Sequence, residues 1–492
     1  MSRGDCPVRG GSLREDHRCG APSDHDRLRR SVANGLVLAT MSVGLVAVVQ
    51  PVAAHAADRA LVAGVVYVDP WAPPIRDGVV LIRDGTITAV GPSATTQIPK
   101  GTVLERLGDG VLVAGFWNSH VHLVTPILLR ASESSNEAVS AELARLFLRW
   151  GFTTVFDLAS TMRTASVIRA RIATGAVFGP NILTVGDPFY PANGTPIYAR
   201  NFYRRFGLPS AEVGTEKQSA ERVNEQASAG ADGVKIFTGA IVGGPEAVRI
   251  MPPKQVRAIV AAARSRRLRV FAHPTDAAGL TVAVESGVEI LAHSAPLAST
   301  TWTALVRNMV ARRMALVPTL SLFEVQPHAD TPVDAAVEQL RAFSAEGGEV
   351  LFGTDAGFTD DADTSSEVRL MSRALSWRQI LATLTTNPAR RFGQQAVRGR
   401  VAPGMVADLV LLTSDPAIDV SVFASVSRVW KAGRPMPVSR GPTTVTRRSD
   451  DSTSAALRWL RSAATSSWPA MASQAAKRRT ESPTTLRKVI AS

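Results

Sequence analysis

Four histidines and one aspartate lie at or just beyond the ends of short apolar runs. His120 and His122 form a His-x-His pair, and His273, His293 and Asp355 each close a later run. Because side chains of an extended segment alternate with period two, the paired imidazoles lie on one side and suit one metal ion. Each residue alone is accounted for as well by packing or capping, but the five together favour a site for Zn²⁺, or for Mn²⁺, Co²⁺ or Fe²⁺.

A lysine lies within another apolar run. Lys235 is the third residue of Gly-Val-Lys-Ile-Phe, where burying an unpaired ammonium would be costly. Carboxylation by CO2 would convert it to an anionic carbamate that bridges two metals. The alternatives are a salt bridge or a charge that reaches solvent along the side chain.

Short apolar runs that alternate with helical stretches would position these residues. The Lys254–Arg266 segment, for example, predicts an amphipathic helix. An alternation of eight runs predicts an α/β fold, a (β/α)8 TIM-like barrel, with an open doubly wound sheet as the alternative. Groups beyond the carboxyl ends of barrel strands meet at one mouth, so the five candidate ligands are expected to face each other. The runs are Val111–Ala114, Thr153–Phe156, Ile182–Val185, Val234–Phe237, Val270–Ala272, Ile290–Ala292, Leu316–Pro318 and Val350–Gly353.

Two β-rich segments flank the predicted barrel. The first has Asp77-Gly78 and Asp84-Gly85 between apolar runs, which is a hairpin signal, and a similar pattern returns over 408–433. The two segments predict a small β-sandwich built from both ends of the mature chain. The predicted organisation is an export signal at 1–57, the first sandwich segment at 58–113, the barrel at 114–393, the second sandwich segment at 394–436 and a disordered basic tail at 437–492.

The ligand pattern resembles the amidohydrolase superfamily from about Leu61 to Pro435. The His-x-His pair, the strand-four lysine, the two later histidines and the aspartate match its metal ligands in order. The Asn387-Pro-Ala389 segment, followed by 399–409, resembles its return from barrel to sandwich. More narrowly, the chain resembles imidazolonepropionase-like and prolidase-like members that have the lysine. It departs at Asn118, where the family usually has Asp.

The resemblance implies a binuclear hydrolase. His120, His122 and Asp355 would hold one divalent ion, most simply Zn²⁺, and His273 and His293 a second. Carboxylated Lys235 and a hydroxide would bridge the two ions, which lower the pKa of the bridging water and polarise the substrate's carbonyl. The hydroxide would attack an amide (C–N) bond of a dipeptide, N-acyl amino acid or cyclic amide, and Asp355 would pass the proton to the leaving group.

Substrate contacts are expected from loops that follow the strands, with Tyr190, Thr238 and Asp360 as candidates and ordinary loop roles as the alternative. Two other functions stay open. One is a mononuclear deaminase of the same fold, for which His273-x-x-Asp276 is the supporting motif. The other is a secreted metal-binding protein whose barrel is catalytically idle.

The N-terminal segment predicts export. Arg27, Arg29 and Arg30 precede the apolar run 35–49, and the small residues 54–57 follow it, in the order typical of a cleaved signal peptide. A secreted, periplasmic or cell-surface protein is therefore expected, by the Sec or twin-arginine route, with an uncleaved anchor as the alternative. Both cysteines, at positions 6 and 19, precede the predicted cut, which excludes thiol chemistry from the mature chain.

The formal charge of +13 is concentrated at the termini. Residues 440–492 contribute +7 and residues 1–34 contribute +2, so the body is nearly balanced. This distribution predicts no nucleic-acid binding by the folded body. The expected partner is a small-molecule substrate, with a homo-oligomer left open. A passive tail is expected from its Ser/Thr/Ala/Arg-rich composition, and no stable membrane insertion is expected after signal cleavage.

Overall fold

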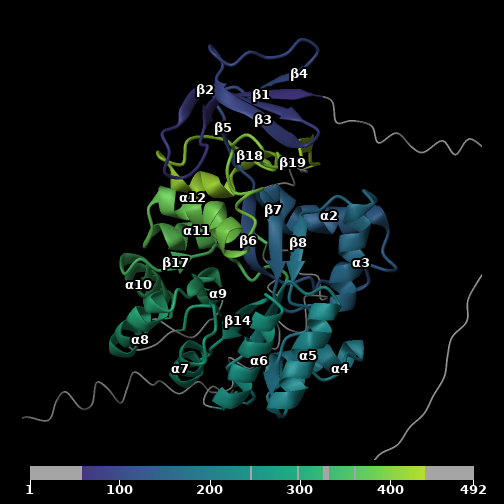
Figure 1. Cartoon of the computed structure of the whole chain (residues 1–492), viewed down its shortest axis with the longest axis vertical. Coiled ribbons are helices and arrows are strands. Elements are labelled where there is room, and N and C mark those ends of the chain that lie inside the picture. The colour runs from purple at the N-terminus through teal and green to yellow at the C-terminus, as the bar shows by residue number, and fades with distance from the viewer. Residues whose placement is uncertain (1–57, 244–246, 296–298, 325–331, 359–361, 438–492) are drawn as a thin grey trace, which may run out of the picture. The chain divides into compact units, whose positions relative to one another are not determined.

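A computed structural model describes residues 58–437 apart from 244–246, 296–298, 325–331 and 359–361 (Figure 1). The predicted export signal lies outside these residues, as do Asp360 and all but the first residue of the predicted tail. None of the helices in the described ranges is long and apolar enough to cross a membrane.

Strands from both ends of the described chain form one eight-stranded sheet. Its β5 (Val111–Ala114) pairs in parallel with β1 (Arg59–Val66) and antiparallel with β18 (Leu409–Leu412), so the late strands join the early ones. Apolar side chains of these strands pack on one another in a core of their own. The remaining strands are β2 (Ile75–Arg83), β3 (Thr86–Pro92), β4 (Val103–Arg106), β19 (Val426–Lys431) and β20 (Arg434–Pro435).

The two Asp-Gly pairs have different roles. Asp84 and Gly85 have positive φ angles of 48° and 76° and join β2 to β3, as a tight hairpin turn requires. Asp77-Gly78 instead lies within β2, so the prediction of a turn there was wrong. The close packing of Gly78 against Val66 accounts for the glycine, because a Cβ there would lie 2.6 Å from a Val66 methyl.

Eight parallel strands carry the candidate ligands. They form a three-stranded sheet, β6-β7-β8, and a five-stranded sheet, β11-β14-β15-β16-β17. The prediction that Val111–Ala114 is the first of them was wrong, because this run belongs to the eight-stranded sheet and the first parallel strand is β6. The strands are β6 (Phe116–Val121), β7 (Phe152–Asp157), β8 (Asn181–Thr184), β11 (Gly233–Phe237), β14 (Arg269–His273), β15 (Ile290–Ala292), β16 (Ala315–Val317) and β17 (Glu349–Val350).

The two parallel sheets meet at both margins. Beyond β8, the Asp232 amide donates to the Thr184 carbonyl at 2.7 Å, and Phe189 pairs in parallel with Ile236 of β11. Beyond β17, Ala356 pairs in parallel with Val121 of β6. Side chains of both sheets also share one core, which includes Trp117 of β6 and Phe271 of β14.

Alternation along the strands separates two apolar layers. In β15, Ile290 and Ala292 belong to the core shared by the two sheets, whereas Leu291 packs outward against the helices. The helix predicted over 254–266 is confirmed as α6. The helices are α1 (Pro126–Leu129), α2 (Asn136–Leu146), α3 (Met162–Ala173), α4 (Ile197–Phe206), α5 (Glu216–Ser228), α6 (Pro253–Ser265), α7 (Ala277–Glu285), α8 (Ser299–Ala311), α9 (Ser321–Glu324), α10 (Pro332–Ala345), α11 (Ser365–Ser372), α12 (Trp377–Leu384) and α13 (Thr386–Arg391).

Candidate metal centre and active site

Three of the predicted ligands form a compact cluster, called the His–Asp cluster below. Asp355 Oδ1 lies 2.7 Å from His122 Nε2 and 3.0 Å from His120 Nε2. One donor atom from each of the three residues lies within 4.8 Å of the others, and all three side chains are largely buried. Two imidazoles and a carboxylate at this spacing are a donor set that can hold a divalent metal ion.

The strand pattern shows why both histidines of the pair point inward. Val121 lies between them and packs in the outer apolar layer, so the period of two puts His120 and His122 on the inner side. Two glycines let the chain after β17 approach this strand. A Cβ on Gly353 would lie 2.8 Å from His120 Cβ, and one on Gly357, whose φ is +94°, would collide with the His122 carbonyl.

Asn118 joins β6 to the residue before Asp355. Its Nδ2 donates to Thr354 Oγ1 at 2.7 Å, and its Oδ1 accepts from the amides of His120 and Thr354 at 3.2 and 3.3 Å. The side chain is fully buried. The residue that departs from the family pattern therefore fixes the two segments that carry the His–Asp cluster.

The two later histidines lie beside the cluster. The ring of His293 is 4.5 Å from that of His120 and 4.6 Å from that of His273, measured between centroids. Phe237 stacks on His273 at 4.5 Å. Four imidazoles therefore form a continuous group, as predicted from their places after the strands.

Hydrogen bonding selects the tautomer of His293. Its Nδ1 lies 2.7 Å from Thr319 Oγ1, and that hydroxyl also lies 2.8 Å from the Pro318 carbonyl, to which it donates. Thr319 therefore accepts from an Nδ1–H group, which leaves Nε2 of His293 with a free lone pair. A ring held in this way is typical of a metal ligand.

Two of the candidate ligands have a positive backbone φ angle. His293 has a φ of 88° and Asp355 a φ of 61°, in the left-handed region that favours glycine. Such conformations cost roughly 1–3 kcal/mol each and occur preferentially at functional sites. Both residues therefore occupy conformations that the surrounding contacts must enforce.

Lys235 is buried within β11, on the strand face that points inward. Its neighbours Val234 and Ile236 pack in the outer layer, and its side chain is 1% exposed. Its ammonium lies 5.8 Å from the centre of the Phe237 ring and forms no ion pair with any residue in the described ranges. Burial lowers the pKa of Lys235 to about 7, although the charge of Asp355 raises it. A neutral amine is the form that reacts with CO2.

The electrostatics of the group favour metal binding. Burial and the charge of Lys235 lower the pKa of His120 to about 3, and burial holds the pKa values of His273 and His293 well below the usual range. Burial alone would raise the pKa of Asp355, but His120 and His122 lower it well below its ordinary value. His120, His273 and His293 are therefore neutral and Asp355 is ionised, the protonation states that ligands require.

The predicted substrate contacts have other partners. Tyr190 is buried, with its ring 4.8 Å from that of Phe237 and 6.0 Å from that of Tyr203, and Phe237 also contacts His273. Thr238 is buried and its hydroxyl donates to the His273 carbonyl at 3.3 Å, which fixes the backbone of that histidine. Asp360 lies outside the described residues.

The motif that supported a mononuclear deaminase has a structural role. Asp276 is the N-cap of α7, and its Oδ1 accepts from the Gly279 amide at 2.8 Å. A carboxylate used as a helix cap is less available to shuttle protons.

Sequence reasoning missed a second group of buried polar residues. Asp157, the last residue of β7, accepts from the Leu123 amide at 3.2 Å and from the hydroxyls of Ser160 and Thr184 at 2.5 and 2.6 Å. It thereby fixes the chain directly after His122. Its place directly after the run 153–156 was the available signal, because the candidate ligands that follow other runs were found by the same rule. Thr319 and Thr354 gave no such signal, since threonine is common in loops.

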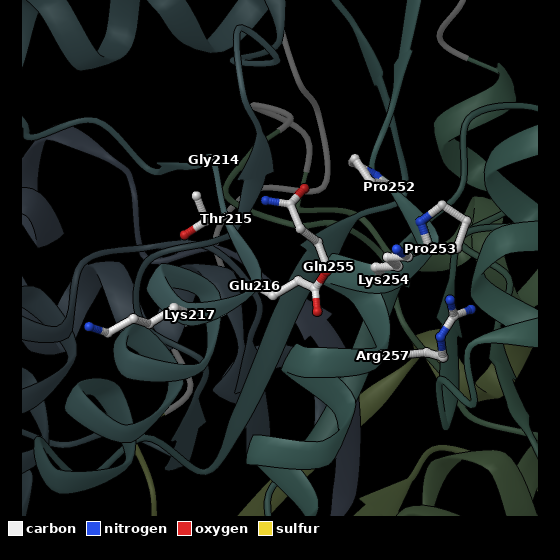
Figure 2. Close-up of a pocket in the computed structure, with 9 residues that line it drawn as sticks. All are labelled: Gly214, Thr215, Glu216, Lys217, Pro252, Pro253, Lys254, Gln255 and Arg257. Atoms are coloured by element: carbon white, nitrogen blue, oxygen red, sulfur yellow. The ribbon is translucent and has the colours of Figure 1, made fainter.

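A hollow of about 790 Å³ lies elsewhere, at the first turns of α5 and α6 (Figure 2). It contains none of the candidate ligands and brings together a mixture of charged and neutral side chains. Its lining residues are Gly214, Thr215, Glu216, Lys217, Pro252, Pro253, Lys254, Gln255 and Arg257.

Comparison with known proteins identifies the family. Residues 111–436 match the amidohydrolase family, and the chain belongs to it. It is therefore an enzyme that acts on carbon–nitrogen bonds.

Particular relatives are distant in sequence. An ochratoxinase from Aspergillus niger is 24% identical over 424 residues, which covers 73% of this chain and 83% of that protein. The crystal structure of a Xaa-Pro dipeptidase with bound methionine matches with a TM-score of 0.65 at 19% identity, covering 77% of this chain and 99% of the other. The crystal structure of a prolidase complexed with N-methylphosphonate-L-proline matches with a TM-score of 0.64 at 22% identity, covering 77% of this chain and 99% of the other. These structures show a shared α/β fold.

Proposed function

We propose that this protein is a metal-dependent hydrolase that cleaves the amide bond of a small substrate, such as a dipeptide, an N-acyl amino acid or a cyclic amide. Two divalent ions would be held, one by the His–Asp cluster and one by His273 and His293, with carboxylated Lys235 between them. The observation that carries the proposal is the single Asp355 oxygen in contact with both His120 and His122.

The residues present fit such ions. Nδ1 of His120 is buried without a hydrogen-bond partner among the described residues, which is costly unless another group binds there. Nε2 of His293 is left free by the Thr319 contact. Two bound ions would supply Lewis acidity, lowering the pKa of a water molecule and polarising the amide carbonyl.

The chain's own groups would then move the proton. Asp355 is held ionised by two imidazoles and is the group placed to accept a proton from water and donate it to the leaving nitrogen. Phe237, stacked on His273, shields that side of the site from water. Asn118 and Thr238 hold the backbone of the ligands.

We infer that the two parallel sheets belong to one (β/α)8 barrel. The proposal rests on the pairings Phe189–Ile236 and Val121–Ala356 at the two margins, and on the core that both sheets share. Such a barrel would bring all six candidate ligands to one mouth.

The test is the metal content of the protein purified without chelators and reconstituted with Zn²⁺ and bicarbonate, together with a hydrolysis screen of dipeptides and N-acyl amino acids. About two ions per chain and hydrolysis of an amide are expected. Lys235→Ala should lose metal and activity, and added short carboxylic acids should restore some of both. Lys217→Ala is the matched control, because that side chain is 86% exposed.

Other outcomes would redirect the proposal. One ion per chain together with deamination would favour the mononuclear alternative, although the capping role of Asp276 weighs against it. Full metal loading without hydrolysis across a broad amide panel would favour a metal-binding protein. Full metal and activity in Lys235→Ala, without added acid, would remove the bridging role.

We also propose export of the chain, on the strength of the apolar run 35–49 and the small residues that follow it. N-terminal sequencing of the protein from its cells or medium tests this. A new N-terminus near residue 57 is expected.

A further inference from the structure

A buried glutamate outside the candidate ligands holds the loop that follows β16. Glu367 of α11 is fully buried. Its Oε1 accepts from the Leu320 amide at 2.9 Å, and its Oε2 accepts from the amide and hydroxyl of Ser321 at 2.7 and 2.8 Å. Three hydrogen bonds therefore tie α11 to residues 320 and 321, more than forty positions earlier in the chain.

The residue before this anchor point contacts a candidate ligand. Thr319 has a φ of 46°, and its hydroxyl accepts from Nδ1 of His293. The amides of His293 and Ser294 also donate to the carbonyls of Val317 and Pro318, at 2.9 and 3.1 Å. Segment 317–321 therefore supports His293 on one side and is held by Glu367 on the other.

From these contacts we propose that Glu367 is a positioning residue for His293. Its carboxylate fixes the Thr319 hydroxyl, which in turn sets the tautomer and ring orientation of the histidine. The effect on metal binding rests on the proposed function, whereas the effect on the His293 ring does not.

The charge pattern favours this role over an ordinary ion pair. Arg369, on the same helix as Glu367, pairs with Glu324 of α9, and Glu367 forms no ion pair with a residue of the described ranges. A buried carboxylate is costly when its charge is balanced by hydrogen bonds alone. The groups that donate these bonds belong to Leu320 and Ser321, directly after Thr319. The buried carboxylate therefore holds the loop that carries Thr319.

The experiment compares Glu367→Gln with Glu324→Gln in the full chain. Glutamine replaces one of the two accepting oxygens with an NH2 group, which cannot accept from a backbone amide. At least one of the three hydrogen bonds is therefore lost. Glu324→Gln removes a carboxylate from the same neighbourhood without touching the loop bonds. Co²⁺ titrations followed by visible absorption would give the affinities of the two ions.

For Glu367→Gln the Co²⁺ site that includes His293 should lose roughly 10–100-fold in affinity, the range seen when support of a metal ligand is removed. The site of the His–Asp cluster should change little, and Glu324→Gln should match the wild type. Glu367→Asp should restore some of the affinity. Equal weakening of both sites, or an equal effect of Glu324→Gln, would overturn the proposal.

A second comparison tests the route through the threonine. Thr319→Val removes the hydroxyl, so adding Glu367→Gln to it should weaken the second site no further. Additive losses would show that Glu367 acts otherwise. Should Glu367→Gln fail to fold, Ser321→Ala removes only one of the three bonds and should give a smaller loss in the same site; an unchanged affinity would then refute the proposal.

A readout on the metal-free protein separates this inference from the proposed function. In ¹⁵N-histidine spectra, the His293 signal, assigned by comparison with His293→Gln, should show the Nδ1–H tautomer in the wild type. In Glu367→Gln it should become a mixture of tautomers. An unchanged His293 signal would overturn the inference even if the protein binds metal and hydrolyses amides, and a changed signal would support it even if the proposed function fails.

Discussion

The stability of this protein should depend on pH through Glu367 in a direction opposite to that of most carboxylates. Burial raises the pKa of Glu367 from 4.5 to about 7, although the hydrogen bonds from Ser321 and Leu320 lower it. A pKa higher in the folded than in the unfolded state gives stability that is present below pH 4.5 and is lost as pH rises through 7. A shift of this size corresponds to about 3 kcal/mol at 1.36 kcal/mol per pKa unit.

Glu367→Gln removes this titration, so the comparison isolates it. Denaturant unfolding of both proteins with a chelator present would be measured from pH 5 to pH 8, because metal binding has its own pH dependence. The free energy of unfolding of the wild type, relative to the variant, should fall by most of the 3 kcal/mol over this range. A difference that stays constant with pH would refute the reasoning, since the carboxylate would then titrate alike in both states.

Three further substitutions test the geometry of the His–Asp cluster. Asp355→Asn keeps a residue type that tolerates a φ of 61° and should fold, but hydrolysis should fall by about 10²-fold or more because the proton carrier is lost, as kcat/KM would show. Gly353→Ala forces a methyl against Val317 and His120 and should cost roughly 1–3 kcal/mol in thermal unfolding and reduce metal content. Gly214→Ala, with only an ordinary 3.5 Å contact, should do neither. Asn118→Ala should lose about 2–3 kcal/mol in denaturant unfolding, while Asn118→Asp should lose less because both acceptor bonds can remain.

Much of the candidate site could be predicted because residues at the carboxyl ends of parallel strands lie close together. His273 ends β14, His293 follows β15, and Lys235 lies inside β11, as the apolar runs around them indicated. The joining of the two chain ends was also predicted, as a small β-sandwich. Strands β1 and β18 do meet through their common neighbour β5, within one eight-stranded sheet. These features depend on local periodicity, which a single sequence displays.

The first parallel strand could not be found in the same way. Segment 116–121 contains asparagine, serine and histidine, so it has no apolar run, and the purely apolar Val111–Ala114 took its place in the prediction. Two of the polar side chains contact the chain after β17, Asn118 at Thr354 and His120 at Asp355, which makes their burial tolerable. The contact of Asn118 joins positions 236 residues apart and leaves no local trace in the sequence.

The candidate ligands are held by hydrogen bonds from residues that are not ligands themselves, and this links folding to metal binding. His293, Thr319 and Asp355 all have positive φ, and each such residue costs roughly 1–3 kcal/mol. Asn118 and Glu367 offset some of that cost with buried hydrogen bonds, yet the contribution of Glu367 itself declines as pH rises above 4.5. Because ions that bind only the folded chain add RT ln(1 + [L]/Kd) to its stability, a strained site of this kind should be most stable when loaded.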